Sequence, residues 1–196
     1  MKTTAADYPR VEVRSRSELR AWLAEHHHRA VGAWVVTFKK GRGPHVSARE
    51  VCEEAICVGW VDSLPRKLDE DRTMLLVTPR RVGSRWSAVN KERATRLLAE
   101  GLVLEAGREV IARAQRDGAW TALDEVEALQ LPEDLATRFA SAPEARRFFD
   151  AFPRSAKRGI LEWILTAKRP ETRARRIEET VECAARNERA NAWKRK

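Results

Sequence analysis

The chain has 196 residues, of which 43% are hydrophobic and 34% are charged, and its formal net charge is +9. This length can bury a core in one large domain or two small ones, and the apolar content, with seven tryptophans, excludes a disordered chain. The positive charge favours anionic partners, although a basic surface that serves only solubility is the simpler explanation.

The cysteines Cys52, Cys57 and Cys183 form neither a disulfide framework nor a metal-binding spacing. Residues 1–15 lack the apolar segment of a secretory signal, and no apolar run approaches the ~20 residues that span a membrane. We therefore expect a cytoplasmic protein that does not insert into membranes. No cofactor or metal motif is present, so we expect neither, and the sequence leaves the oligomeric state open.

The first hundred residues predict helices and strands in alternation. Ser15 stands three residues before Glu18, which is the spacing of a capping box, and an apolar helical face follows. Residues 33–40 alternate between two kinds of side chain and predict a strand with one buried face. A second capping-box spacing predicts a short helix over 47–59.

Residues 60–79 predict two strands around a polar turn, and Pro79 ends the second strand because proline cannot continue a ladder. Asn90 or Ser87 then caps a helix that Gly101 terminates. Beyond this point the apolar periodicity is helical throughout. The further helices are expected over 105–118, 132–142, 143–152, 155–168 and 170–187.

Because the strands are confined to the first half, the sequence predicts an α+β protein. N-terminal helices would pack on a small antiparallel sheet, followed by an all-helical C-terminal half. The expected seam lies near residues 101–104. It divides the chain into an α+β domain over 1–101, with the hairpin and a basic loop, and a helical domain or subdomain over 102–196 packed on it.

The segment 78–90, TPRRVGSRWSAVN, is the strongest candidate for a binding site. It places arginines and serines ahead of a helix start, where free N–H groups and a partial positive charge attract anions. Guanidinium groups match phosphate or carboxylate, and Trp86 could stack a ring or close the pocket. From Pro79 to Arg96 there are six basic residues and the single Glu92.

A structural explanation of this segment stays open. Its arginines could pair with Asp62 or Asp69, Ser87 could serve only as a cap, and Trp86 could fill the core. Asp62 is itself unusual, because aspartate is rare in strands and this one shares a strand face with Trp60. It is either the counter-charge of a polar pocket or half of a structural ion pair.

The last predicted helix carries a second basic cluster. Thr172, Arg173 and Arg176 fall on one face, while Ile177 and Val181 mark the buried stripe. Ten basic and five acidic residues occur from 167 to 196. Neighbouring glutamates can pair with the arginines along the helix, so a solvated charged face is the simpler explanation.

Four segments in order resemble the motifs of the YdeI/OmpD-associated family, whose members are labelled bacteriocin-protection proteins. These segments are EEAICVGWVDSLPRKLDEDR, TPRRVGSRWSAVN, AEGLVLEAG and TAKRPETRARRIEETVE, and the resemblance covers most of the chain. It departs at Ser63, where the family suggests a glycine, and at 102–103, where it suggests a methionine-like residue. The resemblance implies tolerance of antimicrobial peptides or envelope stress through a link to an outer-membrane porin, and it implies no settled chemistry.

If the family has a site, it should lie where these motifs meet. Two arginine-bearing motifs, distant in sequence, could then close over one ligand. The positions that match are Trp60, Asp62, Arg80, Arg81, Ser84, Trp86, Ser87, Asn90, Lys168, Arg169, Thr172, Arg173 and Arg176.

Three functions are compatible with these residues. The first is a stress-tolerance protein that binds an anionic small molecule or an acidic protein segment in an Arg/Ser/Trp pocket. The second is a nucleic-acid-binding protein that uses the basic loop and the last helix, although its aromatic residues lie at core-like spacings rather than on a stacking platform. The third is an enzyme acting on a phosphorylated or carboxylated substrate with Asp62 as general base.

Overall fold

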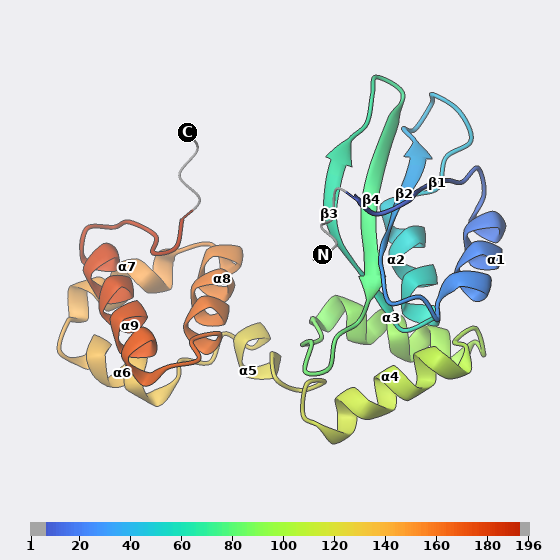
Figure 1. Cartoon of the computed structure of the whole chain (residues 1–196). Coiled ribbons are helices and arrows are strands. Elements are labelled where there is room, and N and C mark those ends of the chain that lie inside the picture. The colour runs from blue at the N-terminus through green and yellow to red at the C-terminus, as the bar shows by residue number, and fades with distance from the viewer. Residues whose placement is uncertain (1–6, 193–196) are drawn as a thin grey trace. The chain divides into compact units, whose positions relative to one another are not determined.

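The computed structural model describes residues 7–192. The chain forms two compact units, unit 1 (Met1–Thr121) and unit 2 (Ala122–Lys196), both drawn in Figure 1. Strands occur only in unit 1 among the described residues, which confirms the predicted α+β class. The division falls later than the expected seam at 101–104 because the next helix packs on unit 1. A Cβ added to Gly107 in that helix would lie 2.4 Å from the Cys57 carbonyl oxygen.

Unit 1 holds the sheet and the first four helices. The strands are β1 (Arg10–Glu12), β2 (Ala33–Phe38), β3 (Trp60–Lys67) and β4 (Arg72–Pro79). The helices are α1 (Arg16–His26), α2 (Ala48–Cys57), α3 (Ala88–Ala99) and α4 (Glu105–Arg116).

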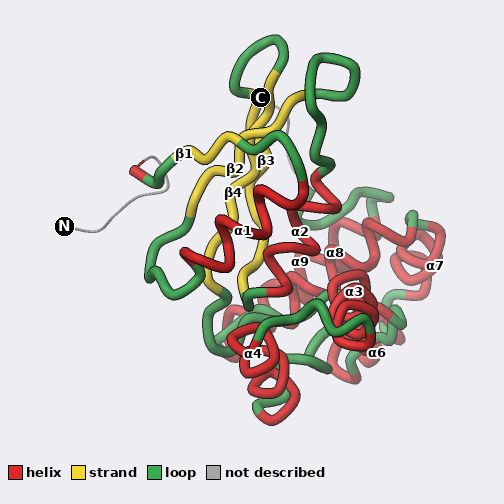
Figure 2. Tube along the Cα trace, turned by 90° about the vertical axis from the view of Figure 1, so that its right-hand side faces the viewer, coloured by secondary structure: helices red, strands yellow, loops and turns green. Residues whose placement is uncertain are grey.

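The strands form one sheet in the order β1-β2-β4-β3, and α1 and α2 cover one of its faces (Figure 2). β2, β4 and β3 pair antiparallel as predicted, but β1 pairs parallel with β2. The sheet is therefore mixed rather than antiparallel. β1 has three residues, which is too short for an alternating pattern, so no periodicity marks it in the sequence.

Strand β2 is buried on both faces, which corrects the prediction of a single buried face. Val35 is fully buried in the cluster that α1 and α2 share with the sheet. On the opposite face Trp34 and Val36 pack with Met74. The Arg66 guanidinium lies 5.0 Å from the centroid of the Trp34 ring on that face. Strands on both sides and packing on both faces leave β2 buried except at its last residue, Phe38, which is partly exposed.

The serines that precede α1 and α2 cap them, as their spacing predicts. At Ser47 the capping box is complete, because Glu50 accepts the Ser47 N–H at 2.8 Å while its own N–H bonds to the serine hydroxyl. At Ser15 only the hydroxyl half is present. The Glu18 carboxylate accepts the N–H of Arg14 instead, at 2.7 Å.

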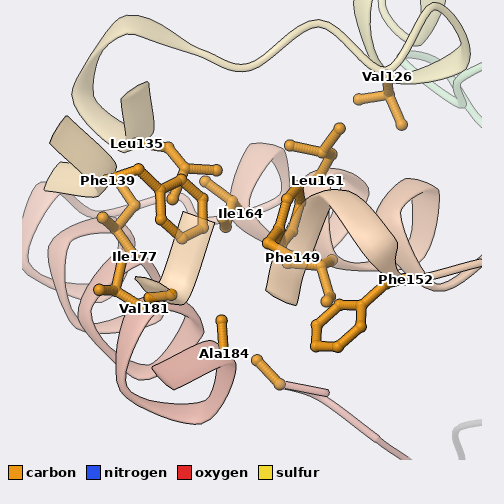
Figure 3. Packing of buried hydrophobic residues seen from close by; sticks show 13 residues of the cluster. Val126, Leu135, Phe139, Phe149, Phe152, Leu161, Ile164, Ile177, Val181 and Ala184 are labelled. Atoms are coloured by element: carbon orange, nitrogen blue, oxygen red, sulfur yellow. The ribbon is translucent and has the colours of Figure 1, made fainter. Parts of the chain in front are cut away.

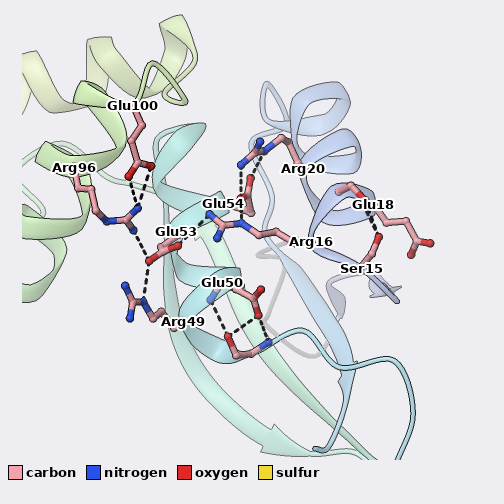
Figure 4. Close-up of polar contacts among 12 residues, drawn as sticks. Ser15, Arg16, Glu18, Arg20, Arg49, Glu50, Glu53, Glu54, Arg96 and Glu100 are labelled. Atoms are coloured by element: carbon pink, nitrogen blue, oxygen red, sulfur yellow. Dashed lines mark hydrogen bonds and ion pairs between the residues drawn. The ribbon is translucent and has the colours of Figure 1, made fainter.

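Helix α2 is the most buried helix of unit 1, with every residue from Val51 to Cys57 buried. This stretch includes two glutamates, Glu53 and Glu54, whose exposed fractions are 2% and 1%. A buried carboxylate costs several kcal/mol unless it is paired and hydrogen-bonded. Both are paired, and Figure 4 shows the arginines around them.

Four arginines pair with these carboxylates, and three of them join α2 to α1 and α3. Glu54 accepts hydrogen bonds from Arg16 and Arg20 of α1, the latter through two nitrogens at 2.8 Å each. The ion pairs of Glu53 are with Arg16 at 3.0 Å, Arg49 at 3.0 Å and Arg96 of α3 at 2.6 Å.

Unit 2 contains only helices in its described residues, and each contributes to one apolar core. Figure 3 shows this core. The rings of Phe139 and Phe149 lie 5.1 Å apart between centroids, and the Phe149 and Phe152 rings 6.0 Å apart. Its four longer helices confirm the predicted ones, while the four-residue α5 was not predicted. The helices are α5 (Asp124–Glu127), α6 (Glu133–Ala140), α7 (Pro143–Ala151), α8 (Arg154–Leu165) and α9 (Pro170–Ala185).

The two ends of the chain carried two expectations from sequence. The N-terminal expectation, that residues 1–15 carry no secretory signal, falls partly on residues 1–6, which lie outside the described residues. The C-terminal expectation, a basic stretch over 167–196, falls partly on residues 193–196, which also lie outside them. Within residues 7–192, no helix has the length and apolar character needed to cross a membrane.

We expect Glu54→Gln to destabilise unit 1 by about 2–3 kcal/mol, because two arginines lose the buried anion that they share. The free energy of unfolding in urea measures this. Glu70→Gln is the matched control: Glu70 is exposed, and its side chain forms no ion pair within residues 7–192, so its effect should stay within about 0.5 kcal/mol. Equal, small effects of the two variants would contradict the role assigned to Glu54.

Acid should weaken unit 1 through Glu53. Burial by itself raises the pKa of this carboxyl group. The combined effect of Arg49, Arg96 and Arg16 lowers it by more, so the folded-state pKa lies below the ordinary 4.5. The unfolded chain therefore binds the proton more tightly than the folded one. This contribution to stability is complete above about pH 4.5 and is lost as the pH falls through the folded-state pKa.

Urea unfolding between about pH 7 and about pH 3 tests this linkage. Compared with the wild type, Glu53→Gln should lose less stability on acidification, because the group that titrates is gone. If the two proteins lose stability in parallel, other carboxyl groups control the acid transition.

Candidate functional site

The loop between β4 and α3 places the predicted arginines and serines in unit 1. β4 ends at Pro79, as expected. The Ser84 N–H then donates to the Arg81 carbonyl at 3.1 Å, and Gly83 between them has φ +71°, a left-handed conformation that glycine adopts without strain. Ser87, rather than Asn90, caps α3: its side-chain hydroxyl accepts a hydrogen bond from the backbone N–H of Asn90.

Arg80 is the one arginine among the described residues that is buried, with an exposed fraction of 6%. The carbon at the centre of its guanidinium lies 3.8 Å from the centroid of the Trp86 ring, so the two planes form a cation–π pair. Its Nη1 donates to the Ser84 hydroxyl at 3.2 Å and to the Arg85 carbonyl at 3.1 Å. Its Nε and Nη2 are buried and have no partner in the described structure.

No carboxylate in the described residues forms an ion pair with Arg80. Asp69, one of the two predicted partners, pairs with Arg72 of its own turn at 2.7 Å. Burial lowers the pKa of Arg80 to about 10, although Cys52 and Asp62 act in the opposite direction. At neutral pH the guanidinium is therefore still cationic. Such a charge is costly inside a protein and requires an explanation.

Trp86 connects the loop to the rest of unit 1. It is 1% exposed and belongs to the apolar cluster formed by α2, α3 and α4. Its backbone N–H donates to the Ala119 carbonyl at 3.3 Å, and its ring lies 5.0 Å from that of Trp120. The Lys91 ammonium is 5.9 Å from the centroid of Trp120, on the other end of this row. Trp86 is thus part of the core as well as the support for Arg80.

A polar cluster surrounds Cys52 between the sheet, α2 and α3. The Cys52 thiol donates to the Asp62 carboxylate at 3.0 Å and lies 3.5 Å from the Asn90 side-chain oxygen. Arg93 donates to the same sulfur at 3.0 Å and to Asn90 at 3.2 Å. Burial, followed by the hydrogen bond to Asp62, raises the pKa of Cys52 to about 12.

The structure therefore brings Asp62, Asn90 and Arg80 into one region, and it adds Cys52 and Arg93, which the sequence analysis did not select. The spacing of Asn90 and Arg93, one helical turn apart, was the available signal for Arg93. Nothing in the sequence relates Cys52 to Asp62, because their contact joins a helix to a strand.

A groove of about 620 Å³ lies beside the loop, on the side of the sheet that carries the Trp34 cluster rather than α1 and α2. Arg81 and Ser84 line it from the loop, and Arg81 is the single charged residue among those that line it. Arg81 is exposed, and its side chain forms no hydrogen bond or ion pair within residues 7–192. The remaining lining residues are Tyr8, Val61, Ser63, Leu76, Thr78, Pro79, Val82 and Gly83.

Trp60 does not face this groove. It is 1% exposed in the core between the sheet and the first two helices. Its indole N–H donates to the His27 carbonyl at 3.0 Å, and its ring meets that of Trp22 edge-on at 6.4 Å. Its contacts are those of a core residue.

The predicted residues of the last helix lie in unit 2, and two of them already have partners there. Arg173 holds Asp134 through two hydrogen bonds of 2.6 and 2.9 Å. Arg176 stacks on Trp163 at 5.0 Å and donates to its carbonyl oxygen, which completes the end of α8. Three others, Lys168 and Arg169 just before α9 and Thr172 within it, form no side-chain hydrogen bond or ion pair in the described part of the chain and are exposed or half-buried.

The two arginine-bearing motifs belong to different compact units. Their closure over one ligand stays a prediction. Within unit 1, however, the loop residues form one continuous arrangement. Arg80 is buried against Trp86, Ser84 bonds to Arg80, and Ser84 and the exposed Arg81 line the groove.

Two family models match the chain, one in each unit. Residues 11–110, just over half of the chain, match a family described as a domain of unknown function (DUF8412). The chain belongs to the DUF8412 family. The groove, the loop and the cluster around Cys52 all lie within this match, apart from Tyr8.

Residues 128–187 match a model described as bacteriocin-protection, YdeI or OmpD-associated. The predicted resemblance is thus confirmed for unit 2. Three of the four segments that carried it lie instead in the DUF8412 match. None of the curated proteins and none of the solved structures compared with the chain matches it significantly.

The thiols should react in a fixed order. Cys52 and Cys57 are buried, and burial raises their pKa values to about 12 and about 11, so both stay protonated at neutral pH. Cys183 is partly exposed. A maleimide followed by mass spectrometry should label Cys183 first and the other two only after unit 1 opens in urea. Native labelling of Cys52 as fast as Cys183 would contradict the closed packing around it.

Proposed function

We propose that this protein binds an anionic ligand at residues 80–84 of unit 1. We further propose that this binding supports the bacteriocin-protection role named in the description of the family that unit 2 matches, and that it does so in the cytoplasm. The ligand is a small anion or the acidic part of a protein partner. The proposal assigns no reaction to the site.

The observation that carries this proposal is the unpaired charge of Arg80. Elsewhere in unit 1 the chain surrounds each buried carboxylate with two or more arginines, as at Glu53 and Glu54. At Arg80 it leaves a buried cation with two nitrogens, Nε and Nη2, that have no partner in the described structure. A fold selected only for stability would pair or remove such a charge. Its retention is explained if the positive potential serves a ligand.

The exposed neighbours of Arg80 are suited to contact that ligand. Arg81 presents a guanidinium at the groove, and guanidinium groups bind carboxylate and phosphate through paired hydrogen bonds. Ser84 connects Arg80 to the groove: it lines the groove, and its hydroxyl accepts a hydrogen bond from Arg80. Arg80 then acts through Ser84 as a positioning residue.

The contacts of the last helix weigh against nucleic-acid binding. Arg173 is held by Asp134, and Arg176 by backbone and Thr166 oxygens, so neither is free to bind phosphate without losing a partner. An enzymatic role for Asp62 also meets an obstacle, since its carboxylate accepts the Cys52 thiol. Both alternatives stay open as outcomes of the experiment below.

A thermal-shift titration tests the proposal, with sulfate, phosphate, nucleotides, acidic peptides and short RNA and DNA at low and moderate salt. We expect stabilisation by anions that persists at moderate salt, of about 2.7 kcal/mol at a concentration 100 times the Kd. Arg81→Ala should abolish it with the fold intact. Arg85→Ala is the matched control, because Arg85 is an exposed arginine of the same loop that does not line the groove.

Arg80→Met separates ligand binding from loop structure. Methionine keeps an apolar chain over Trp86 while it removes the charge. We expect the free energy of unfolding without ligand to change by less than about 1 kcal/mol, because loss of a buried unpaired charge offsets two lost hydrogen bonds. Stabilisation by anions should fall.

Three outcomes would overturn the proposal. A loss of more than about 3 kcal/mol in Arg80→Met, with no anion effect in the wild type, would make Arg80 a structural residue. Stabilisation only by polyanions, vanishing with salt, would favour nucleic acid. Equal effects of the Arg81 and Arg85 substitutions would exclude a specific site at the groove.

A further inference from the structure

We propose that the ligand of the groove is an amphiphilic carboxylate, with one anionic head bound at the loop and an apolar body lying on the sheet. This inference rests on the proposed function and names the class of its ligand. It follows from the size of the groove, from the single charge that lines it, and from the direction in which Ser84 can donate.

The groove is larger than a compact anion requires. Its volume of about 620 Å³ lies within the ~300–1,000 Å³ of sites that hold organic ligands. A sulfate or phosphate ion bound at the loop would leave most of this space to water. The groove is therefore matched to a ligand with a body as well as a charge.

The charged part of the groove is confined to one end. Arg81 and Ser84 belong to the loop that follows β4. β3 and β4 themselves contribute the apolar Val61 and Leu76 and the uncharged hydroxyl side chains of Ser63 and Thr78. Tyr8 adds an aromatic side chain and packs on the cluster that contains Leu76. A ligand aligned along the groove would place its head on Arg81 and its body on these apolar side chains.

The lining carries a single cation, which favours a head with one negative charge. Arg81 can neutralise a carboxylate through two parallel hydrogen bonds. A second negative charge would find no other guanidinium in the lining, because Arg80 is buried and reaches the groove only through Ser84. A carboxylate is thus the better match than a phosphate monoester at neutral pH.

Ser84 supports the same assignment through its polarity. Its hydroxyl oxygen accepts a hydrogen bond from Nη1 of Arg80 at 3.2 Å. Arg80 cannot accept in return, because a guanidinium has donors only. The hydroxyl proton of Ser84 is therefore available to an acceptor, and a ligand carboxylate at Arg81 would supply one. The buried cation thereby fixes Ser84 as a donor toward the groove.

The experiment compares three probes by isothermal titration calorimetry. The probe 4-phenylbutyrate has both body and charge, 4-phenylbutyramide has the body alone, and acetate has the charge alone. We expect 4-phenylbutyrate to bind at least about tenfold more tightly than either of the others. A short peptide that ends in a free leucine carboxylate, compared with its C-terminal amide, tests whether the same chemistry can come from a protein.

Three variants locate the interaction. Arg81→Gln and Ser84→Ala should each weaken 4-phenylbutyrate, by about tenfold for the arginine, while Arg85→Gln should leave its Kd within about twofold. Val61→Thr keeps the size and branching of the side chain, and it should weaken 4-phenylbutyrate but not acetate. Circular dichroism and the melting temperature of each variant verify its fold.

The outcomes separate this inference from the proposed function. If acetate or inorganic phosphate binds as tightly as 4-phenylbutyrate, the amphiphile is wrong and an anion site remains. If 4-phenylbutyramide binds as tightly as 4-phenylbutyrate, both this inference and the proposed anion binding are wrong for this groove. If 4-phenylbutyrate does not bind while the earlier titration finds another anion, only this inference fails. Binding of the free peptide in preference to the amide and to 4-phenylbutyrate would support the chemistry and assign its source to a protein terminus.

Discussion

Unit 1 depends on the pairing of two glutamates inside its most buried helix. Glu53 and Glu54 of α2 are almost fully buried, and four arginines of α1, α2 and α3 neutralise them. Without these arginines, each glutamate would be an uncompensated charge in the interior. The network therefore fixes α1 and α3 against α2. Since α3 begins where the arginine loop ends, this network also fixes one end of the candidate site.

The loop follows the opposite rule. Arg80 is buried like the glutamates of α2, though slightly less completely, yet its partners are a hydroxyl, a carbonyl and the face of Trp86. A guanidinium can accept this arrangement because its flat face stacks on an aromatic ring while its edges donate. The result is a positive potential under a groove whose exposed side chains can contact an anion. The buried carboxylates of α2 and the proposed anion site at the loop thus use the same residue type, arginine, in different pairings.

Much of this architecture could be predicted from local patterns. The helices capped by Ser15 and Ser47 begin where hydroxyl-to-amide spacing placed them, α3 begins after Ser87, one of its two expected caps, and β4 ends at Pro79. Such signals act within three or four residues, so the sequence displays them directly. The three-residue β1 escaped prediction because it carries no period, and the double burial of β2 escaped because that depends on both neighbouring layers.

The sequence alone determined which residue types gather at the loop: arginines, serines and a tryptophan before a helix start, within 78–90. Only the tertiary structure decided their roles. It buried Arg80 without a carboxylate, left Arg81 at the groove, and occupied Arg173 of the last helix with Asp134. The physical reason is that composition sets how much charge is present, whereas burial and pairing, which depend on residues distant in sequence, decide whether a charge is neutralised or available to a ligand.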